Sequence, residues 1–233
     1  MNHMKTIGLI GGISWESTVT YYQMLNRAVR ARLGGLHSAR VILNSVEFKE
    51  VADYQSAGDW DSACRIMVEA AQSIERGGAD CLLIGANTMH KCAEAITAAV
   101  DIPLIHIADV TAAAIKAAGC KKPLLLATRY TMEQDFYRGH LASRHGVNAV
   151  VPDDNARTVV HDIIYNELCQ GIVTPVAKEK YLNIIADAVQ NGCDGVIFGC
   201  TEIGLLLTPD DVSIPAFDTA HLHAEAAVDF ALS

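Results

Sequence analysis

Apolar and polar positions follow two different rhythms along the chain. Short runs rich in Ile, Leu and Val occur at residues 7–10, 82–84, 124–126 and 196–198. Longer segments whose apolar residues have helical spacing lie between these runs, for example residues 18–33 and 61–76. Continuous apolar strands that alternate with helices are typical of βαβ units, in which a parallel sheet is covered on both faces. The pattern therefore predicts an α/β fold.

The pattern also occurs twice. "LLIGANTMH" at residues 82–90 and "VIFGCTEIG" at residues 196–204 are both apolar runs that end in Gly, one small residue and polar groups. A constant offset of 114 residues relates three pairs: Asp80 and Asp194, Gly85 and Gly199, and Ala86 and Cys200. Looser matches are "IPLIHIAD" with "IPAFDTAH", and "KTIGLIGG" with "KPLLLATR". Self-similarity at about half the chain length predicts two similar, pseudo-duplicated α/β half-domains with parallel sheets.

Polar loops follow four of the predicted strands. They read "GGIS" from residue 11, "ANTMH" from 86, "ATRYT" from 127 and "CTEIG" from 200. Ligands of open α/β sheets bind beyond the carboxyl ends of the strands. We therefore expect these loops to contribute to one active site, in a cleft between the two halves.

Cys200 is the residue in these loops with the most distinctive chemistry. It follows a strand and precedes a predicted helix, whose N-terminus would lower the pKa of the thiol and favour a nucleophile or base. A buried structural cysteine is the alternative interpretation. Thr201 and Glu202 beside it favour a reactive thiol, because an inert core cysteine does not need polar neighbours.

The other loops offer groups that could bind a substrate carboxylate. Asn87 and Thr88 have side chains and backbone N–H groups suited to an anion, although either could simply cap a helix. Ser14 is a candidate donor in a glycine-rich turn that lacks the nucleotide-binding spacings. Thr128, Arg129 and Thr131 complete the set, and Arg129 could hold a carboxylate with two hydrogen bonds.

Composition narrows the classes of partner. The net charge of −9 without a basic block argues against nucleic acid as a partner. The apolar runs are too short to span a bilayer, and the N-terminus lacks the layout of a secretory signal, so we expect a cytoplasmic protein without membrane contacts. The seven cysteines contain no CxxC pair, which indicates neither a disulfide framework nor a zinc ribbon. We expect most of them to be reduced.

Four segments together carry a family resemblance. "IGLIGGISWESTVTYY", "NTMH", "LLATRYTMEQDFY" and "GCTEIGLLL" occur in this order, and the chain resembles the aspartate racemase branch of the aspartate/glutamate racemase superfamily. The resemblance implies two α/β halves with the active site between them, a homodimer, an amino-acid substrate, and catalysis without pyridoxal phosphate, other cofactors or metal. It also implies that residues 209–233 return to a first domain of residues 1–109, which leaves residues 110–208 as the second domain.

The resemblance further implies a mechanism. Two cysteines on opposite sides of the substrate remove and return the Cα proton, and each acts as the base in one direction. Cys200 matches the cysteine on the L-substrate side. Ala86 occupies the position of the other, and a methyl group can neither accept nor donate a proton.

Three explanations of Ala86 stay open from the sequence. It could be an engineered replacement, or a natural loss in an enzyme that uses Cys200 alone. It could also reflect a one-cysteine reaction, as in the related arylmalonate decarboxylases. A non-catalytic amino-acid-binding protein is a further alternative, and aspartate, glutamate or related amino acids are all candidate substrates.

Overall fold

The computed structural model describes residues 4–233 and divides into two compact units. The first unit comprises the described residues up to His106 together with His223–Ser233, and the second comprises Ile107–Leu222. The divisions thus fall after residues 106 and 222 rather than after residues 109 and 208 as expected from the resemblance. The later return has a structural reason: strand β6 (Ala216–Asp218) pairs with β5 (Gly195–Phe198), which keeps this segment with the second sheet.

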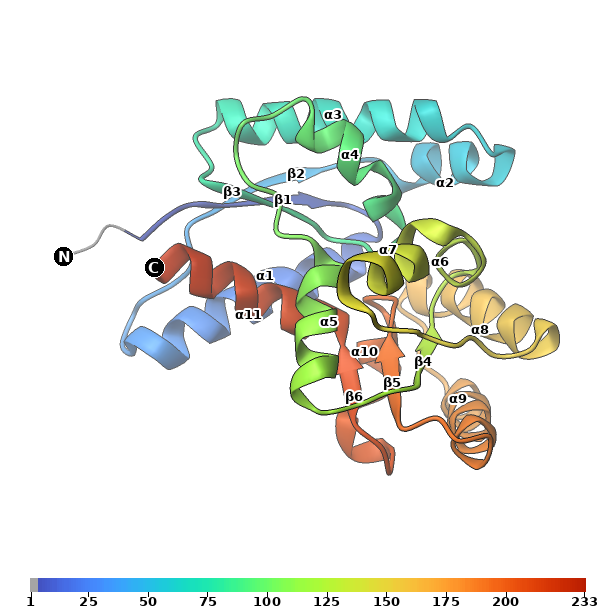
Figure 1. The fold of residues 1–233 in the computed structure, drawn as a ribbon. Helices are drawn as coiled ribbons and strands as arrows, with labels where there is room; N and C mark the ends of the chain where they lie inside the picture. Colours follow the sequence, from blue (N-terminus) through green and yellow to red (C-terminus); the bar gives the residue numbers. More distant parts are fainter. Residues whose placement is uncertain (1–3) are drawn as a thin grey trace. The chain divides into compact units, whose positions relative to one another are not determined.

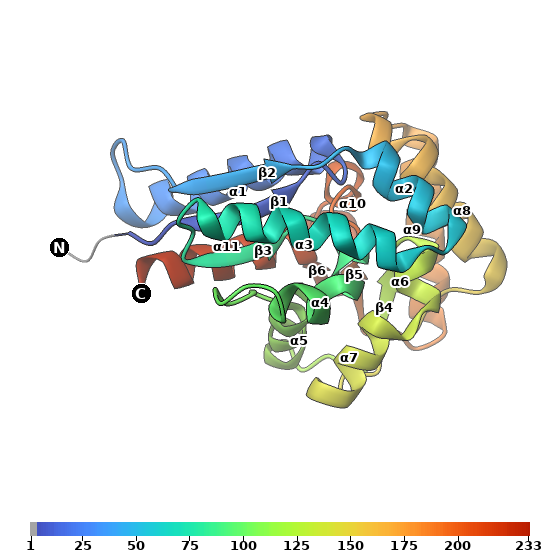
Figure 2. The same cartoon turned by 90° about the horizontal axis from the view of Figure 1, so that it is seen from above.

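The first unit is built on a parallel sheet in the order β2-β1-β3. Figures 1 and 2 show α3 on one face of this sheet, and α1 with the part of α11 from His223 on the other. The core is formed by apolar residues of β1, β3 and α3. Its elements are β1 (Ile7–Gly11), α1 (Trp15–Leu33), β2 (Val41–Ser45), α2 (Phe48–Ala57), α3 (Trp60–Arg76), β3 (Cys81–Ile84), the 3-10 helix η1 (Thr88–Cys92) and α4 (Ala93–Thr97).

The second unit is built on a parallel sheet in the order β4-β5-β6. Helices α5 and α7 lie on one face and α8 and α9 on the other (Figures 1 and 2). Besides β5 and β6 it contains α5 (Ile107–Ala117), β4 (Pro123–Leu126), α6 (Arg129–Glu133), α7 (Asp135–His145), α8 (Asp154–Asn166), η2 (Leu168–Gln170), α9 (Pro175–Gln190), α10 (Ile203–Leu206), η3 (Pro209–Asp211) and the start of α11 (Thr219–Leu232). All four predicted strands, and the predicted α/β class, are confirmed.

Equivalent hydrogen bonds show that the two units repeat one design. The Asp80 carboxylate accepts from the N–H of Thr6, just before β1, at 2.6 Å, and the Asp194 carboxylate accepts from the N–H of Lys122, just before β4, at 2.7 Å. At the other end of the strands, the N–H of Gly85 donates to Ile10 O at 2.8 Å and that of Gly199 to Leu126 O at 2.7 Å. The repeat therefore places Ala86 and Cys200 at equivalent positions, each one residue past the last ladder hydrogen bond.

The turn from β1 into α1 requires glycine at residue 12. Gly12 has φ +90°, and a Cβ there would lie 2.2 Å from Val46 O and 2.7 Å from Val46 N. Both of these are backbone atoms of a neighbouring segment, which cannot move aside like a flexible side chain. The glycine-rich turn between β1 and α1 therefore cannot accept a side chain at residue 12.

Gly12→Ala is expected to lower the free energy of unfolding by roughly 2–3 kcal/mol, because it adds a steric clash to a left-handed backbone conformation. Urea unfolding followed by circular dichroism measures the loss. Gly58→Ala is the matched control: Gly58 has φ +73° but open space around its Cβ position, so that variant should lose only about 1 kcal/mol. Equal losses in the two variants would contradict the assigned clash.

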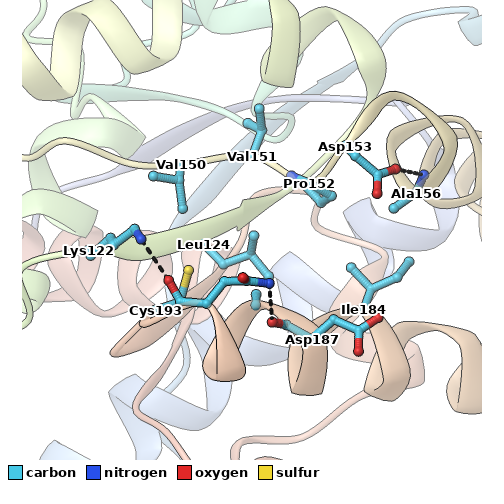
Figure 3. A pocket seen from close by; sticks show the side chains of 12 residues that line it. Lys122, Leu124, Val150, Val151, Pro152, Asp153, Ala156, Ile184, Asp187 and Cys193 are labelled. Carbon is cyan, nitrogen blue, oxygen red and sulfur yellow. Dashed lines mark hydrogen bonds between the residues drawn. The ribbon is translucent and has the colours of Figure 1, made fainter.

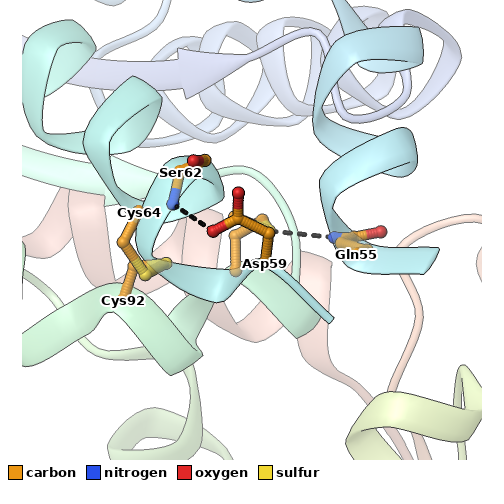
Figure 4. Close-up of a disulfide and its surroundings, with 6 residues drawn as sticks. Gln55, Asp59, Ser62, Cys64 and Cys92 are labelled. Carbon is orange, nitrogen blue, oxygen red and sulfur yellow. Dashed lines mark hydrogen bonds between the residues drawn. A yellow bond between two sulfur atoms is a disulfide. The ribbon is translucent and has the colours of Figure 1, made fainter. Parts of the chain in front are cut away.

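A disulfide links α3 to the end of η1 in the first unit. Figure 4 shows the bond between Cys64 and Cys92, which are 28 residues apart in sequence. The other five cysteines are free thiols, as expected for most of them, but the sequence did not predict this pair. The bond ties the segment after the Ala86 loop to the helix that covers the sheet.

Within residues 4–233, every helix is too short or too polar to cross a membrane.

Candidate active site

Cys200 lies at the carboxyl end of β5, within the second unit. The strand ends at Phe198, Gly199 makes the last ladder hydrogen bond, and Cys200 then begins the turn toward α10. Its side chain is buried, with 8% exposed. The predicted position of this thiol, immediately after a strand, is confirmed.

Burial and a neighbouring carboxylate, rather than a helix dipole, set the ionisation of Cys200. Its Sγ donates a hydrogen bond to Glu202 Oε2 at 2.9 Å, and the Thr201 hydroxyl donates to the same oxygen at 2.8 Å. Burial, followed by the negative charges of Glu202 and Cys169, raises the pKa of the Cys200 thiol well above its usual value. The expected lowering is wrong, because α10 begins only at Ile203 and has four residues. This environment holds Cys200 in its protonated thiol form.

The equivalent loop of the first unit is also buried. Ala86 is 6% exposed, and Asn87 and Thr88 are buried beside it. The segment continues as the 3-10 helix η1, which the Asn87 side chain does not cap. Capping therefore does not explain Asn87, and anion binding by Asn87 and Thr88 stays a prediction.

His90 holds the Ala86 loop in place. Its Nδ1 is hydrogen-bonded to Ala86 O at 2.9 Å, and its buried ring makes edge contacts with His106 and His223. His223 in turn bonds the Tyr21 hydroxyl through Nδ1 at 2.9 Å and Ile105 O through Nε2 at 2.7 Å. Burial lowers the pKa of His223 to about 4, so its ring is neutral at physiological pH. A packed network of rings thus fixes the backbone at residue 86.

Ser14 begins α1. Its hydroxyl accepts the N–H of Ser17, and its carbonyl accepts from the hydroxyls of Ser17 and Thr18 at 3.1 and 2.9 Å. The Ser14 side chain is buried. Its observed role is therefore helix capping, and contact with a substrate stays a prediction.

Three further candidates lie together at the carboxyl end of β4. The Thr128 hydroxyl caps α6 by accepting the N–H of Thr131, and the two hydroxyl oxygens are 3.3 Å apart. Thr131 is fully buried, whereas Arg129 is exposed. The "ATRYT" segment was expected to be a loop, but only Ala127 and Thr128 link β4 to α6, which begins at Arg129. The carboxylate contact of Arg129 stays a prediction.

Sequence reasoning missed an aromatic group beside this loop. The N–H of Arg129 donates to His161 Nδ1 at 3.3 Å, and the His161 ring contacts the rings of Tyr130 and Tyr165. Burial, and then the Arg129 charge, lower the pKa of His161. Burial, followed by the neighbouring Tyr130, Cys169 and Cys200, raises the pKa of Tyr165. The four-residue spacing of His161 and Tyr165 on α8 was the available signal, because it places both on one helix face.

Comparison with known proteins now identifies the lineage. Residues 10–227 match the family model of the Asp/Glu/Hydantoin racemases. The chain belongs to this racemase family. It is 51% identical to a candidate Asp/Glu racemase from Yersinia pestis, with a TM-score of 0.90 over 99% of this chain and 100% of the other.

Two further relatives of this racemase-family chain support the assignment. An aspartate racemase homologue from Pyrococcus horikoshii OT3 is 34% identical, with a TM-score of 0.85 over 99% of this chain and 100% of the other. The broad specificity amino-acid racemase RacX from Bacillus subtilis (strain 168) is 21% identical over 73% of each chain. The predicted family resemblance is confirmed.

The racemase-family chain also has a cavity that lies away from the segments containing Thr128 and Cys200. Figure 3 shows it in the second unit, where it encloses about 320 Å³. Lys122 and Cys193 in its wall precede β4 and β5, so the cavity lies at the amino ends of these strands. Thr128 and Cys200 follow the carboxyl ends of the same strands. The cavity is therefore separate from the candidate site.

Proposed function

We propose that this chain is a cofactor-independent amino-acid racemase, or a one-sided Cα proton exchanger of that lineage, acting on aspartate, glutamate or related amino acids. The observation that carries the proposal is the contact between the Cys200 thiol and the Glu202 carboxylate, 2.9 Å apart at the end of β5. A racemase family provides the context for this pair.

The pair contains both an acid and a base. In one direction, the Sγ–H bond breaks and its proton goes to the substrate carbanion at Cα. In the other direction, Glu202 takes the Sγ proton, and the resulting thiolate removes the Cα proton of the L enantiomer. The thiolate left in the first direction recovers its proton from the protonated Glu202. Only protons move in either direction, so the reaction requires no oxidant or reductant.

Substrate binding is assigned to the strand-end loops. Asn87 and Thr88 would hold the α-carboxylate and stabilise the negative charge that develops as the Cα proton leaves. Ser14, Thr128, Arg129, Thr131 and Thr201 are proposed as further polar contacts. The family resemblance also supports a homodimer.

Ala86 determines which reaction the chain can complete. Without a second thiol, proton exchange at Cα is expected on the L face, with slow or no inversion. A one-cysteine decarboxylase or isomerase and a non-catalytic amino-acid-binding protein are the alternatives. The discriminating test is proton NMR of L- and D-aspartate and L- and D-glutamate incubated with the protein in D2O.

In this test we expect the Cα proton signal of one or both L enantiomers to disappear while the D enantiomers keep theirs. Chiral chromatography of the same samples measures inversion separately. Absence of exchange with all four amino acids, combined with binding of one of them, would support the binding-protein alternative. Release of CO2 from a substituted malonate without amino-acid exchange would support the decarboxylase.

Glu202→Gln tests the proton acceptor. We expect exchange to fall about 10²-fold, within the usual range for loss of an acid–base group. Iodoacetamide should nevertheless alkylate Cys200 faster at a fixed pH, because removing a negative neighbour lowers the thiol pKa. Quenched-exchange NMR and mass spectrometry measure the two rates.

Glu167→Gln is the control for this variant. Glu167 is another carboxylate of the second unit, and its Oε2 accepts from the Thr174 hydroxyl at 2.8 Å. Neither rate should change by more than about twofold in this control. Slower alkylation in Glu202→Gln would show that Glu202 favours the thiolate, which contradicts the assigned electrostatics.

A further inference from the structure

The disulfide of the first unit lies next to the loop that carries Ala86. Cys64 is on α3, and Cys92 is the last residue of η1, the 3-10 helix that begins at Thr88. His90, whose Nδ1 is hydrogen-bonded to Ala86 O, also belongs to η1. The bond in Figure 4 therefore attaches the whole segment of residues 86–92 covalently to the helix that covers the sheet.

Two noncovalent contacts act on the same 3-10 helix. Gln55 Nε2, on α2, donates to Met89 Sδ at 3.0 Å, and both side chains are buried. Lys91 Nζ lies 4.1 Å from the centroid of the Trp60 ring at the start of α3. These contacts would keep η1 near its position if the disulfide were opened. The covalent bond is the connection that a change of redox state can remove.

The repeat shows that this half-domain design does not depend on a disulfide. The 114-residue offset places Lys178 and Leu206 in the second unit at the positions equivalent to Cys64 and Cys92. Lys178, on α9, forms an ion pair with Asp211 at 2.6 Å, and Leu206 ends α10. Neither side chain can form a disulfide. The bond is thus an addition to the copy that carries Ala86.

We propose that the Cys64–Cys92 bond is a reversible redox switch, which controls the order of residues 86–92 and through it the affinity for the substrate carboxylate. In the oxidised state the bond fixes Asn87 and Thr88, whereas in the reduced state they must be ordered by the substrate. A loop that is ordered before binding gives the higher affinity, because its entropy is already lost on folding. The effect on affinity rests on the proposed function, and the effect on the loop does not.

A dithiol reductant would open the bond in two steps. Cys64 is partly exposed, whereas Cys92 is 1% exposed, so the first attack falls on Cys64 Sγ. A thiolate of the reductant bonds to this sulfur, the S–S bond breaks, and the electron pair leaves with Cys92 Sγ. The second thiolate of the reductant then displaces Cys64. The dithiol is oxidised to its disulfide by two electrons, and its two protons end on the two cysteines.

Hydrogen exchange measures the switch without any substrate. Wild-type protein oxidised with oxidised glutathione and then reduced with dithiothreitol is compared by mass spectrometry, with the disulfide confirmed by peptide mapping. We expect the amides of residues 86–92 to exchange at least tenfold faster in the reduced state. The equivalent loop of the second unit, residues 200–206, is the internal control and should exchange equally in both states.

A double variant, Cys64→Ser with Cys92→Ser, should behave like the reduced wild type in both buffers. We expect its dissociation constant for L-aspartate or L-glutamate, measured by calorimetry, to be about fivefold higher than that of the oxidised wild type. Circular dichroism confirms that the variant is folded. Cys120→Ser is the matched control: Cys120 is a free thiol of the second unit that donates to Asp194 Oδ1 at 2.8 Å, and this variant should keep the redox response.

Four results would overturn the switch. These are failure of the bond to form with oxidised glutathione, equal exchange of residues 86–92 in the two redox states, a redox response that persists in the double variant, and equal affinity for a bound amino acid in both states. If the segment responds but neither amino acid binds in either state, the proposed function fails, whereas redox control of the loop stands.

Discussion

Cys200→Ser is expected to abolish Cα proton exchange, with a loss of about 10²–10⁴-fold, the contribution typical of a positioned acid–base group. Serine nearly preserves the size of the side chain and can still donate to Glu202 Oε2, which accepts from Sγ at 2.9 Å in the wild type. The serine hydroxyl is a far weaker acid than a thiol, so it donates a proton to the carbanion at Cα much more slowly. Loss of the Cα proton signal in D2O measures the rate.

Cys193→Ser is the matched control for this result. Cys193 is also a buried free thiol of the second unit, but it precedes β5, whereas Cys200 follows it. The control should keep exchange within about twofold of the wild type. If Cys200→Ser also kept the wild-type rate, a group other than this thiol would be the acid–base catalyst.

The rate of alkylation should show that Cys200 is not an activated nucleophile. Because burial and nearby negative charges raise the pKa of Cys200, the thiol stays protonated through neutral pH, and its reaction with iodoacetamide should be slower there than that of a model thiol. The rate should rise as the pH approaches the elevated pKa. A bound dicarboxylic amino acid should reduce it further.

Local sequence patterns predicted the strands and the repeat because each depends on neighbours in the chain. Continuous apolar runs became β1, β3, β4 and β5, and the 114-residue offset reappears as equivalent hydrogen bonds of Asp80 and Asp194. A strand that is buried on both faces is apolar along its whole length, so the apolar runs alone were sufficient to locate these strands. The strand-end loops followed from the same reasoning.

Features that depend on distant segments could not be predicted in this way. The pKa of Cys200 depends on the direction of the Glu202 carboxylate and on the length of α10, neither of which the "GCTE" motif specifies. Cys64 and Cys92 meet only because α3 packs beside η1. His161 reaches Arg129 across 32 residues of sequence. Tertiary packing decides all three.

Ala86→Cys is expected to confer inversion on a chain for which we propose exchange of the L enantiomer alone. The repeat makes residue 86 equivalent to Cys200, since Gly85 and Gly199 donate corresponding hydrogen bonds just before them. Ala86 is buried, and its carbonyl is held by His90 Nδ1 at 2.9 Å. A thiol added there would therefore have a fixed backbone and a restricted set of rotamers.

The gain in inversion should be about 10²-fold or more, because the variant supplies the missing proton donor and acceptor. Chiral chromatography after incubation with L-aspartate or L-glutamate measures the product, and NMR in D2O should now show exchange of the D enantiomers as well. Ala86→Ser is the control, since it adds a similar volume without a group that ionises near neutral pH. Equal inversion in Ala86→Cys and Ala86→Ser would assign the effect to packing. Inversion in Ala86→Cys alone would assign it to the new thiol. If adding Cys200→Ser to Ala86→Cys then abolished inversion, the reaction would require both thiols.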